Sequence, residues 1–277
     1  MPRNQGSMLC PSCGKLISVG EERCPFCGAW RPGLYGWAPI VQRFFGRQFD
    51  VIRLIMVVCV TLYVASLLLQ PEAILSGGGG LFNFLSPGSK ALYQLGMTGG
   101  IAWRQGWWWT VFTAIYLHGS LLHIFFNLMI VQNLAPGVNQ VYGPARAFVI
   151  FSLSGAAGFV LSNLVSGSAT VGASGSIFGL FAALIVYGRR VGHTMLTRQL
   201  WPWVIINFVL GFTMSNVNIW AHAGGFAGGW VIAEAMRFND DKRESLGVQL
   251  LALALLLATA AGFVLSFVNV TAILMGK

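Results

Sequence analysis

Five polar side chains stand out in this sequence because they lie in apolar stretches and are of types that can do chemistry. Ser174 belongs to the turn-like segment "GASG" at 172–175, which opens an apolar run. His222 opens a later apolar run, whereas His118, His123 and Asn127 lie near the start of an earlier one. A serine hydroxyl becomes a nucleophile when a nearby base takes its proton, and histidine is the usual base. The sequence therefore predicts serine chemistry, provided that its helices bring these residues together.

The composition predicts that those helices cross a membrane. Of the 277 residues, 56% are hydrophobic and 9% are charged, whereas a soluble domain has about 25% charged residues. Long apolar runs account for the difference, so we expect an all-α polytopic membrane protein. The predicted spans are 52–71, 110–135, 146–165, 174–188, 200–216, 222–236 and 247–273.

The basic residues predict the orientation of these spans. With the N-terminus in the cytoplasm, fourteen of the 17 Lys and Arg residues fall on the inside. Only Lys90, Arg104 and Lys277 fall outside, in agreement with the positive-inside rule. Seven spans then place the C-terminus outside. The distribution of the basic residues is thus more informative than the formal charge of +9; no nucleic-acid partner is expected, and nucleic-acid binding is a weak alternative for the N-terminal module.

The same topology places Ser174 and His222 at one depth. Fifteen residues separate Ser174 from Arg189, and fifteen separate His222 from Arg237. Each stretch is ~22 Å of helix, which is shorter than the ~30 Å hydrocarbon core. Both helices run inward, so both side chains should lie several ångströms below the outer surface.

An oxyanion hole is the further requirement of serine chemistry. His123 and Asn127 are four residues apart, so they share one helix face, and we expect them to act with the backbone N–H of Ser174. The spans hold almost no acidic residue, so the sequence predicts a Ser-His dyad without a cofactor. The absence of an HExxH sequence disfavours zinc-protease chemistry.

Small residues predict close contact between the two helices that carry the dyad. Gly225 and Gly229 are four residues apart on one helix, and Gly175 and Gly179 are four apart on the other. Such spacing lets helix backbones approach closely in a membrane. Phe178, one turn below Ser174, is expected to pack under the His222 imidazole.

Four cysteines near the N-terminus predict a metal site. Two CxxC pairs, each followed by glycine, are typical of tetrahedral zinc. Disulfides are the alternative, but a cytoplasmic location favours thiolates. Since four thiolates close the coordination shell, the predicted zinc is structural. The four cysteines are Cys10, Cys13, Cys24 and Cys27.

Three motifs in order resemble those of the rhomboid intramembrane serine proteases. The family's GxSG appears at 172–175, its HxxxxHxxxN at His118, His123 and Asn127, and its AHxxGxxxG at 221–229. The resemblance, over about residues 51–237, implies Ser174 as nucleophile and His222 as base. It implies His123, Asn127 and the Ser174 amide as oxyanion stabilisers, and His118 as a structural residue bonded to the first loop.

The resemblance also implies the architecture and the substrates. We expect a zinc-ribbon-like module at 1–30, a linker at 31–50, a six-helix catalytic core at 51–240 and an additional C-terminal helix at 241–277. Substrates would be transmembrane helices cut near the outer surface of a bacterial inner membrane. The module's role, including whether it binds a cytoplasmic partner, stays open.

One departure from the family concerns the long loop at 71–109. Many members carry a Trp-Arg pair before the second span, where this chain has Trp109 and Thr110. How that loop is braced is therefore an open question. Its tryptophan cluster, which includes Trp103 and Trp107–Trp109, is typical of a membrane-interface belt.

Other interpretations assign these residues no catalytic role. Ser174 could be a plain helix N-cap, His222 a satisfied core histidine, and His123 and Asn127 interhelical polar contacts. A rhomboid-like protein that binds or chaperones transmembrane clients without cutting them is the functional alternative. A transporter or channel would need a charged or carbonyl-lined path, which the spans hardly offer.

Overall fold

The chain folds into two compact units. This computed structural model describes residues 6–10, 13–32, 51–73, 83–213, 217–236 and 244–276. The units are Met1–Leu54 and Ile55–Lys277, and each is considered by itself. Nearly all of the predicted 31–50 linker lies outside the described residues, as does the basic residue Arg237 used above to estimate depth.

The first unit is a small two-stranded structure. Strand β1 (Ser7–Leu9) pairs antiparallel with β2 (Leu16–Ser18), with Met8 opposite Ile17. The side chains of Met8, Ile17 and Val19 are buried, together with those of two cysteines. This apolar core is too small to fold such a short chain alone, so the unit needs another source of stability.

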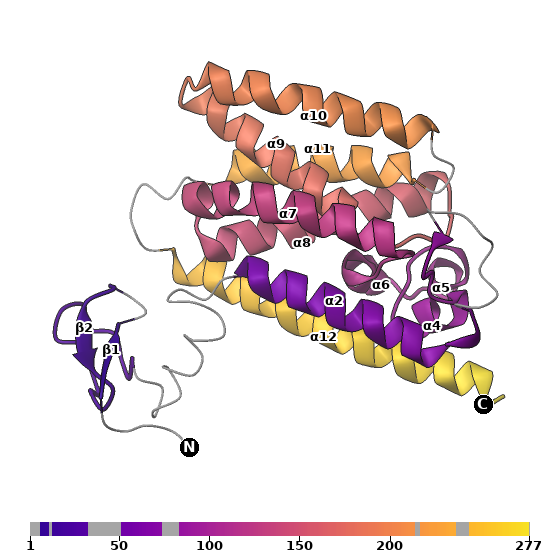
Figure 1. Cartoon of the computed structure of the whole chain (residues 1–277), viewed down its shortest axis with the longest axis horizontal. Helices are drawn as coiled ribbons and strands as arrows, with labels where there is room; N and C mark the ends of the chain where they lie inside the picture. The colour runs from indigo at the N-terminus through magenta and orange to yellow at the C-terminus, as the bar shows by residue number, and fades with distance from the viewer. Residues whose placement is uncertain are drawn as a thin grey trace. The chain divides into compact units, whose positions relative to one another are not determined.

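The second unit is helical over its described residues, as predicted (Figure 1). Helices α8, α9 and α11 pack on one another, and α12 packs on α8, α6 and α4. The long helices are α2 (Val51–Leu69), α7 (Leu121–Tyr142), α8 (Pro144–Val165), α9 (Ser174–Arg190), α10 (Thr194–Thr213), α11 (Ile219–Ala235) and α12 (Leu246–Leu274). The short ones are α4 (Ser89–Gln94), α5 (Gly100–Arg104), α6 (Thr110–Thr113) and the 3₁₀ helix η3 (Ala114–Tyr116).

Two of the predicted spans differ from the observed helices by more than a few residues. The span predicted at 110–135 is wrong, because α6 and η3 end at Tyr116 and α7 begins only at Leu121. The break forms because Ser120 is extended and its hydroxyl accepts the His123 N–H at 3.3 Å, which starts a new helix. Helix α10 begins at Thr194, six residues earlier than predicted, and Pro202 lies inside it.

Within the described ranges, four helices are long and apolar enough to cross a membrane, judged by length and composition: α2, α7, α8 and α12. Helices α9 and α11, which carry Ser174 and His222, have 17 residues each. This length corresponds to ~25 Å, a few ångströms less than the hydrocarbon core.

Glycines allow α8, α9 and α11 to pack with their backbones nearly in contact. A Cβ atom at Gly225 would overlap the backbone of Gly175, and one at Gly229 would overlap that of Gly179. A Cβ at Gly158 of α8 would likewise overlap the carbonyl oxygen of Ala221 in α11. The small-residue faces predicted on α9 and α11 therefore meet each other.

The loop before α6 is braced by hydroxyl groups and by α12. The Thr110 hydroxyl donates to the Trp107 carbonyl at 2.7 Å and lies 3.0 Å from the Thr98 hydroxyl. The Thr98 hydroxyl also accepts from the Asn163 amide of α8 at 3.0 Å. Threonine at 110 thus joins a buried network that ties the loop to α8.

The tryptophan cluster of this loop packs mainly on protein rather than forming an exposed belt. Trp107 is buried, and the indole N–H of Trp109 donates to the Ser266 hydroxyl of α12 at 3.0 Å. Trp108 is the exposed member of the three consecutive tryptophans. Helix α12 therefore helps to fix the position of this loop.

Replacing Gly225 with alanine is expected to destabilise the second unit by about 2 kcal/mol or more, because overpacking forces the two backbones apart. The melting temperature of the purified protein in detergent measures this change. Gly247→Ala is the matched control, since a Cβ at this helical position meets nothing within 4 Å. An unchanged melting temperature for Gly225→Ala would show that the α9–α11 contact is looser than described.

Candidate active site

Ser174 is the first residue of α9 and is half-buried. The N-cap position is Ala173, and no side chain caps this helix. The interpretation of Ser174 as a plain N-cap is therefore wrong. The first N–H groups of a helix have no intrahelical partner, so the backbone amide of Ser174 is available as a donor at this end of α9.

His222 lies in the first turn of α11, and Asn218 fixes that turn. The Asn218 side-chain oxygen accepts the Ala221 N–H at 3.1 Å, and its amide donates to the Ser162 hydroxyl of α8 at 2.6 Å. The His222 side chain is buried, and its Nδ1 has no hydrogen-bond partner among the described residues. Nδ1 lies on the side of α10, next to Gly211. No described carboxylate serves His222 as a third triad member.

The packing of α9 against α11 brings the turns of Ser174 and His222 together. A Cβ at Gly175 would lie 3.1 Å from the Ala221 carbonyl oxygen, so the residues next to Ser174 and His222 touch. One turn along α9, the Phe178 ring stacks on the His222 imidazole with centroids 4.5 Å apart and planes at 28°. Phe208 of α10 packs edge-on against Phe178 at 4.6 Å.

His123 lies against the segment that leads into α9. Its Nδ1 accepts the backbone N–H of Gly119 at 3.3 Å, so a neutral ring carries its proton on Nε2. A Cβ at Gly172 would come within 2.7 Å of Nε2 and Cε1 of this ring. Gly172 also has φ +129°, a conformation that side chains disfavour. Glycine at 172 thus lets the His123 Nε2–H approach the segment just before Ser174.

Asn127 lies one turn further along α7 and is buried. Its side-chain amide donates to the His123 carbonyl at 2.8 Å. An asparagine amide has two N–H groups, so one donor remains. Its side-chain oxygen has no hydrogen-bond partner among the described residues.

His118 is fully buried in the turn between η3 and α7. Its ring packs edge-on against that of His123, with centroids 5.2 Å apart. The hydrogen bond expected from His118 to the first loop is absent from the described part of the chain, where neither ring nitrogen has a partner. What the structure does show is the contact of His118 with the His123 ring.

Three positioning residues were not identified from the sequence. Asn218 and Ser120 cap α11 and α7, the helices that carry His222 and His123. Serine or asparagine ahead of an apolar run is a recognised helix-start signal, so both were detectable. Phe208 gave no such signal, because its role depends on a contact between separate helices.

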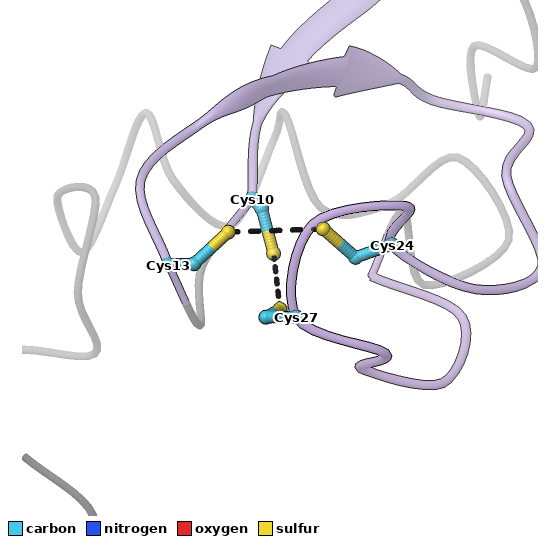
Figure 2. A group of neighbouring side chains, drawn as sticks. All are labelled: Cys10, Cys13, Cys24 and Cys27. Atoms are coloured by element: carbon cyan, nitrogen blue, oxygen red, sulfur yellow. Dashed lines mark hydrogen bonds between the residues drawn. The ribbon is translucent and has the colours of Figure 1, made fainter.

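The four N-terminal cysteines form a candidate metal site (Figure 2). Their sulfur atoms all lie within 4.8 Å of one another. The Cys10 and Cys27 sulfurs are 3.8 Å apart, and those of Cys13 and Cys24 are 3.7 Å apart. A tetrahedral zinc with Zn–S bonds of ~2.3 Å puts its sulfurs ~3.8 Å apart. A disulfide would need ~2.05 Å, so the disulfide alternative does not fit.

The backbone around Cys24 favours its thiolate form. Burial raises the pKa of this thiol, but the backbone N–H groups of Phe26 and Cys27 and two neighbouring thiols lower it to about 7. N–H groups aimed at a sulfur stabilise the charged form, which is the form that binds a metal. The cluster could therefore hold a metal ion.

Comparisons with known proteins agree on the family of the helical unit. Residues 105–239 match the rhomboid domain. The chain is 33% identical over 162 residues to rhomboid protease GluP of Bacillus subtilis, covering 57% of this chain and 32% of that protein. It is 29% identical over 161 residues to YdcA of the same bacterium, covering 55% of this chain and 80% of YdcA. Rhomboid-type serine protease 2 of Emericella nidulans is 30% identical over 155 residues, 51% of this chain and 29% of that protein.

Proposed function

Residues 105–239 belong to the rhomboid family of integral membrane proteins, and on this premise we propose that the chain is an intramembrane serine endopeptidase with Ser174 as nucleophile and His222 as base. The observation that carries the proposal is the α9–α11 contact, in which Gly175 meets Ala221 and Phe178 stacks on His222. This contact supports a fixed position of the His222 ring relative to the turn that carries Ser174. A positioned base is what a serine nucleophile needs.

The proposed reaction proceeds through an acyl-enzyme. His222 Nε2 takes the proton of the Ser174 hydroxyl as Oγ attacks the carbonyl carbon of the scissile peptide bond. The C–N bond then breaks, and His222 gives the proton to the leaving amine. Water, activated by the same histidine, hydrolyses the ester and restores Ser174. We assign the base to Nε2 because Nδ1 is buried on the side of α10.

The oxyanion formed in each half of the reaction is stabilised by three proposed donors. They are the Nε2–H of His123, the second N–H of the Asn127 amide and the backbone N–H of Ser174. The Gly119–His123 hydrogen bond supports this role because it leaves the proton of a neutral ring on Nε2. Donors fixed before the reaction stabilise developing charge without reorganisation.

Substrates are proposed to be transmembrane helices of other membrane proteins, cut near the outer membrane surface. The scissile carbonyl must leave its helix to reach Ser174, so segments weakened by Gly or Pro should be preferred. We further propose a bacterial inner membrane, with the N-terminus in the cytoplasm and the C-terminus outside. The client-binding alternative has no specific support, since both dyad residues are present.

A fluorophosphonate probe tests the proposal directly. An activated serine attacks the phosphorus, fluoride leaves, and a covalent adduct forms on Oγ. We expect one adduct on the purified protein, mapped by mass spectrometry to Ser174 and missing in Ser174→Ala and His222→Ala. An unlabelled folded protein that also fails to cut several transmembrane substrates would favour the client-binding alternative.

Asn127→Ala is expected to lower kcat by about 10²–10³-fold with little change in KM, since it removes one oxyanion donor. Cleavage of a fluorescent transmembrane substrate measures both constants. Asn133→Ala is a close control, because the Asn133 amide also donates to a carbonyl one turn back, Met129, on the same helix. Equal loss of kcat in both variants would assign the effect to helix stability rather than to the oxyanion.

We also propose that the four cysteines bind one structural Zn²⁺. Cys10, Cys13, Cys24 and Cys27 supply four sulfurs at spacings that fit a tetrahedral ion. With all four positions filled by protein, the ion would stabilise the first unit and take no part in peptide cleavage.

A further inference from the structure

A groove lies where α9 ends and α10 begins, at the opposite end of α9 from Ser174. Its volume is about 360 Å³, and it is lined by Gly188, Arg189, Gly192, Thr194, Thr197 and Arg198. The turn that forms it is fixed by the His193 N–H, which donates to the Gly188 carbonyl at 2.7 Å. Gly192 has φ +71° at the tip of this turn.

Most of the area that lines the groove is apolar, but its lining residues include two arginines and two threonines and no carboxylate. Arg189 comes from α9 and Arg198 from α10, and the two threonine hydroxyls lie on the same face of α10 as Arg198. The ion pairs described in this structure involve other arginines, Arg31 with Glu22 and Arg190 with Glu234. Two cations from separate helices beside two hydroxyls are suited to a phosphate group.

Arg189 is held in place without losing its donors. Its guanidinium lies over the Trp230 ring of α11, 5.1 Å from the centroid. A guanidinium stacked by its face keeps the N–H groups at its edge for in-plane hydrogen bonds. This contact with α11 therefore fixes Arg189 at the groove and leaves it able to bind an anion.

The surroundings of the groove are apolar and exposed. Val191 and Met195 flank the turn, and Trp201 and Trp203 follow on α10; all four side chains are exposed. A free anion in water gains nothing from exposed apolar neighbours, whereas the acyl chains of a lipid can pack against them. Tryptophan next to arginine is typical of the interface between hydrocarbon and headgroups.

We propose that this groove binds the phosphate of an anionic phospholipid of the inner leaflet. The basic residues predict that this end of α9 faces the cytoplasm, and basic pockets between helices on that side bind anionic headgroups. The arginines and threonines hold the phosphate, and the exposed apolar residues of α10 contact the acyl chains. This lipid site is separate from the proposed dyad, so it does not depend on proteolysis.

Native mass spectrometry of the full chain tests the proposal, with the number of bound lipids as the readout. The protein is released from nanodiscs that contain equal parts of dioleoylphosphatidylglycerol and dioleoylphosphatidylcholine. We expect the wild type to retain phosphatidylglycerol selectively. The variant Arg189→Gln/Arg198→Gln should retain at least roughly tenfold less phosphatidylglycerol, because each arginine near an anionic lipid surface contributes appreciably to binding.

Two controls keep the result interpretable. Arg104→Gln removes one exposed charge on α5, and it should leave lipid retention unchanged. Arg198→Gln alone keeps the Arg189–Trp230 contact, so a loss of lipid there cannot come from disturbed packing of α11. Normal melting temperature and size-exclusion profile confirm that each variant is folded.

A second experiment distinguishes binding of a phospholipid from binding of free phosphate. Inorganic phosphate, at an ionic strength matched by chloride, is added to the protein in detergent, and melting temperature is recorded. We expect no stabilisation by phosphate and a clear one by phosphatidylglycerol. Stabilisation by inorganic phosphate as large as that by the lipid would overturn the lipid assignment. Equal phosphatidylglycerol retention by the wild type and both groove variants would overturn the site itself.

Discussion

Ser174→Ala is expected to reduce the rate of substrate cleavage by about 10⁴-fold or more, since losing one member of a nucleophile–base unit disables the unit. His222→Ala, which removes the base, should lower the rate of cleavage nearly as much, because the Ser174 hydroxyl is a weak nucleophile without a base. The measurement is cleavage of a fluorescent transmembrane substrate by the purified protein in liposomes. The double variant Ser174→Ala/His222→Ala should be no slower than either single variant.

The chain offers a matched control on the same helix. Ser176 lies two residues beyond Ser174, and its buried hydroxyl has no hydrogen-bond partner in the described structure. Removing an unsatisfied hydroxyl is nearly neutral, so Ser176→Ala should be folded and active. Full activity of Ser174→Ala would refute the proposed nucleophile. Equal loss in both variants would point to disturbed packing of α9.

Local sequence signals predicted much of the candidate site. Glycines four residues apart indicated that α9 and α11 meet, and a Cβ at Gly225 would indeed overlap Gly175. The packing of Phe178 under His222 also followed from helical spacing, and the rings do stack. Both cases depend on periodicity within one helix, which a sequence displays directly.

Contacts between distant segments could not be predicted in this way. The Asn218 amide donates a hydrogen bond to Ser162, 56 residues away, and the Trp109 indole donates one to Ser266, 157 residues away. The sequence indicates that Asn218 is a helix cap, but it does not indicate which helix the side-chain amide of Asn218 will contact. The break before α7 was missed for a different reason, because the polar residues His118 and Ser120 and the intervening Gly119 were included in one long span although they interrupt the apolar run.

The bracing of the loop before α6 shows how one missing residue can be replaced by several contacts. Where many family members have arginine, Thr110 bonds to the Trp107 carbonyl and reaches the Thr98 hydroxyl. Thr98 in turn accepts from Asn163. Because such hydroxyls are neutral, they satisfy buried polar groups without the cost of burying a charge. The departure at Thr110 therefore leaves the loop tied to α8 near the candidate site.

The length of α9 and α11 agrees with the depth proposed for that site. Each has 17 residues, which is ~25 Å of helix. On the proposed topology both helices end at the inner surface, so Ser174 at the start of α9 and His222 in the first turn of α11 lie below the outer surface. In the proposed reaction water enters from the outer side, because hydrolysis requires it and because irregular backbone within the membrane needs a polar or protein environment.

Removing the metal is expected to unfold the first unit and leave the second intact. The buried apolar side chains of the first unit are few, and domains this small usually need metals or disulfides. Structural zinc contributes about 10–16 kcal/mol of apparent binding free energy in small zinc domains. We therefore expect one zinc per chain in the purified protein and a protease-sensitive N-terminus after chelation.

Replacing one cysteine separates this prediction from general damage. Cys24→Ser should lose the zinc, because it removes the thiol whose pKa is lowered to about 7 by neighbouring groups. Cys59→Ala is the matched control, since Cys59 is buried in α2 and lies outside the four-sulfur cluster. It should keep one zinc per chain, measured by elemental analysis. Zinc-free protein should still cut a substrate that lacks a cytoplasmic tail, because the proposed dyad belongs to the other unit. A loss of cleavage on chelation alone, restored by zinc, would instead assign the metal a role in the helical core.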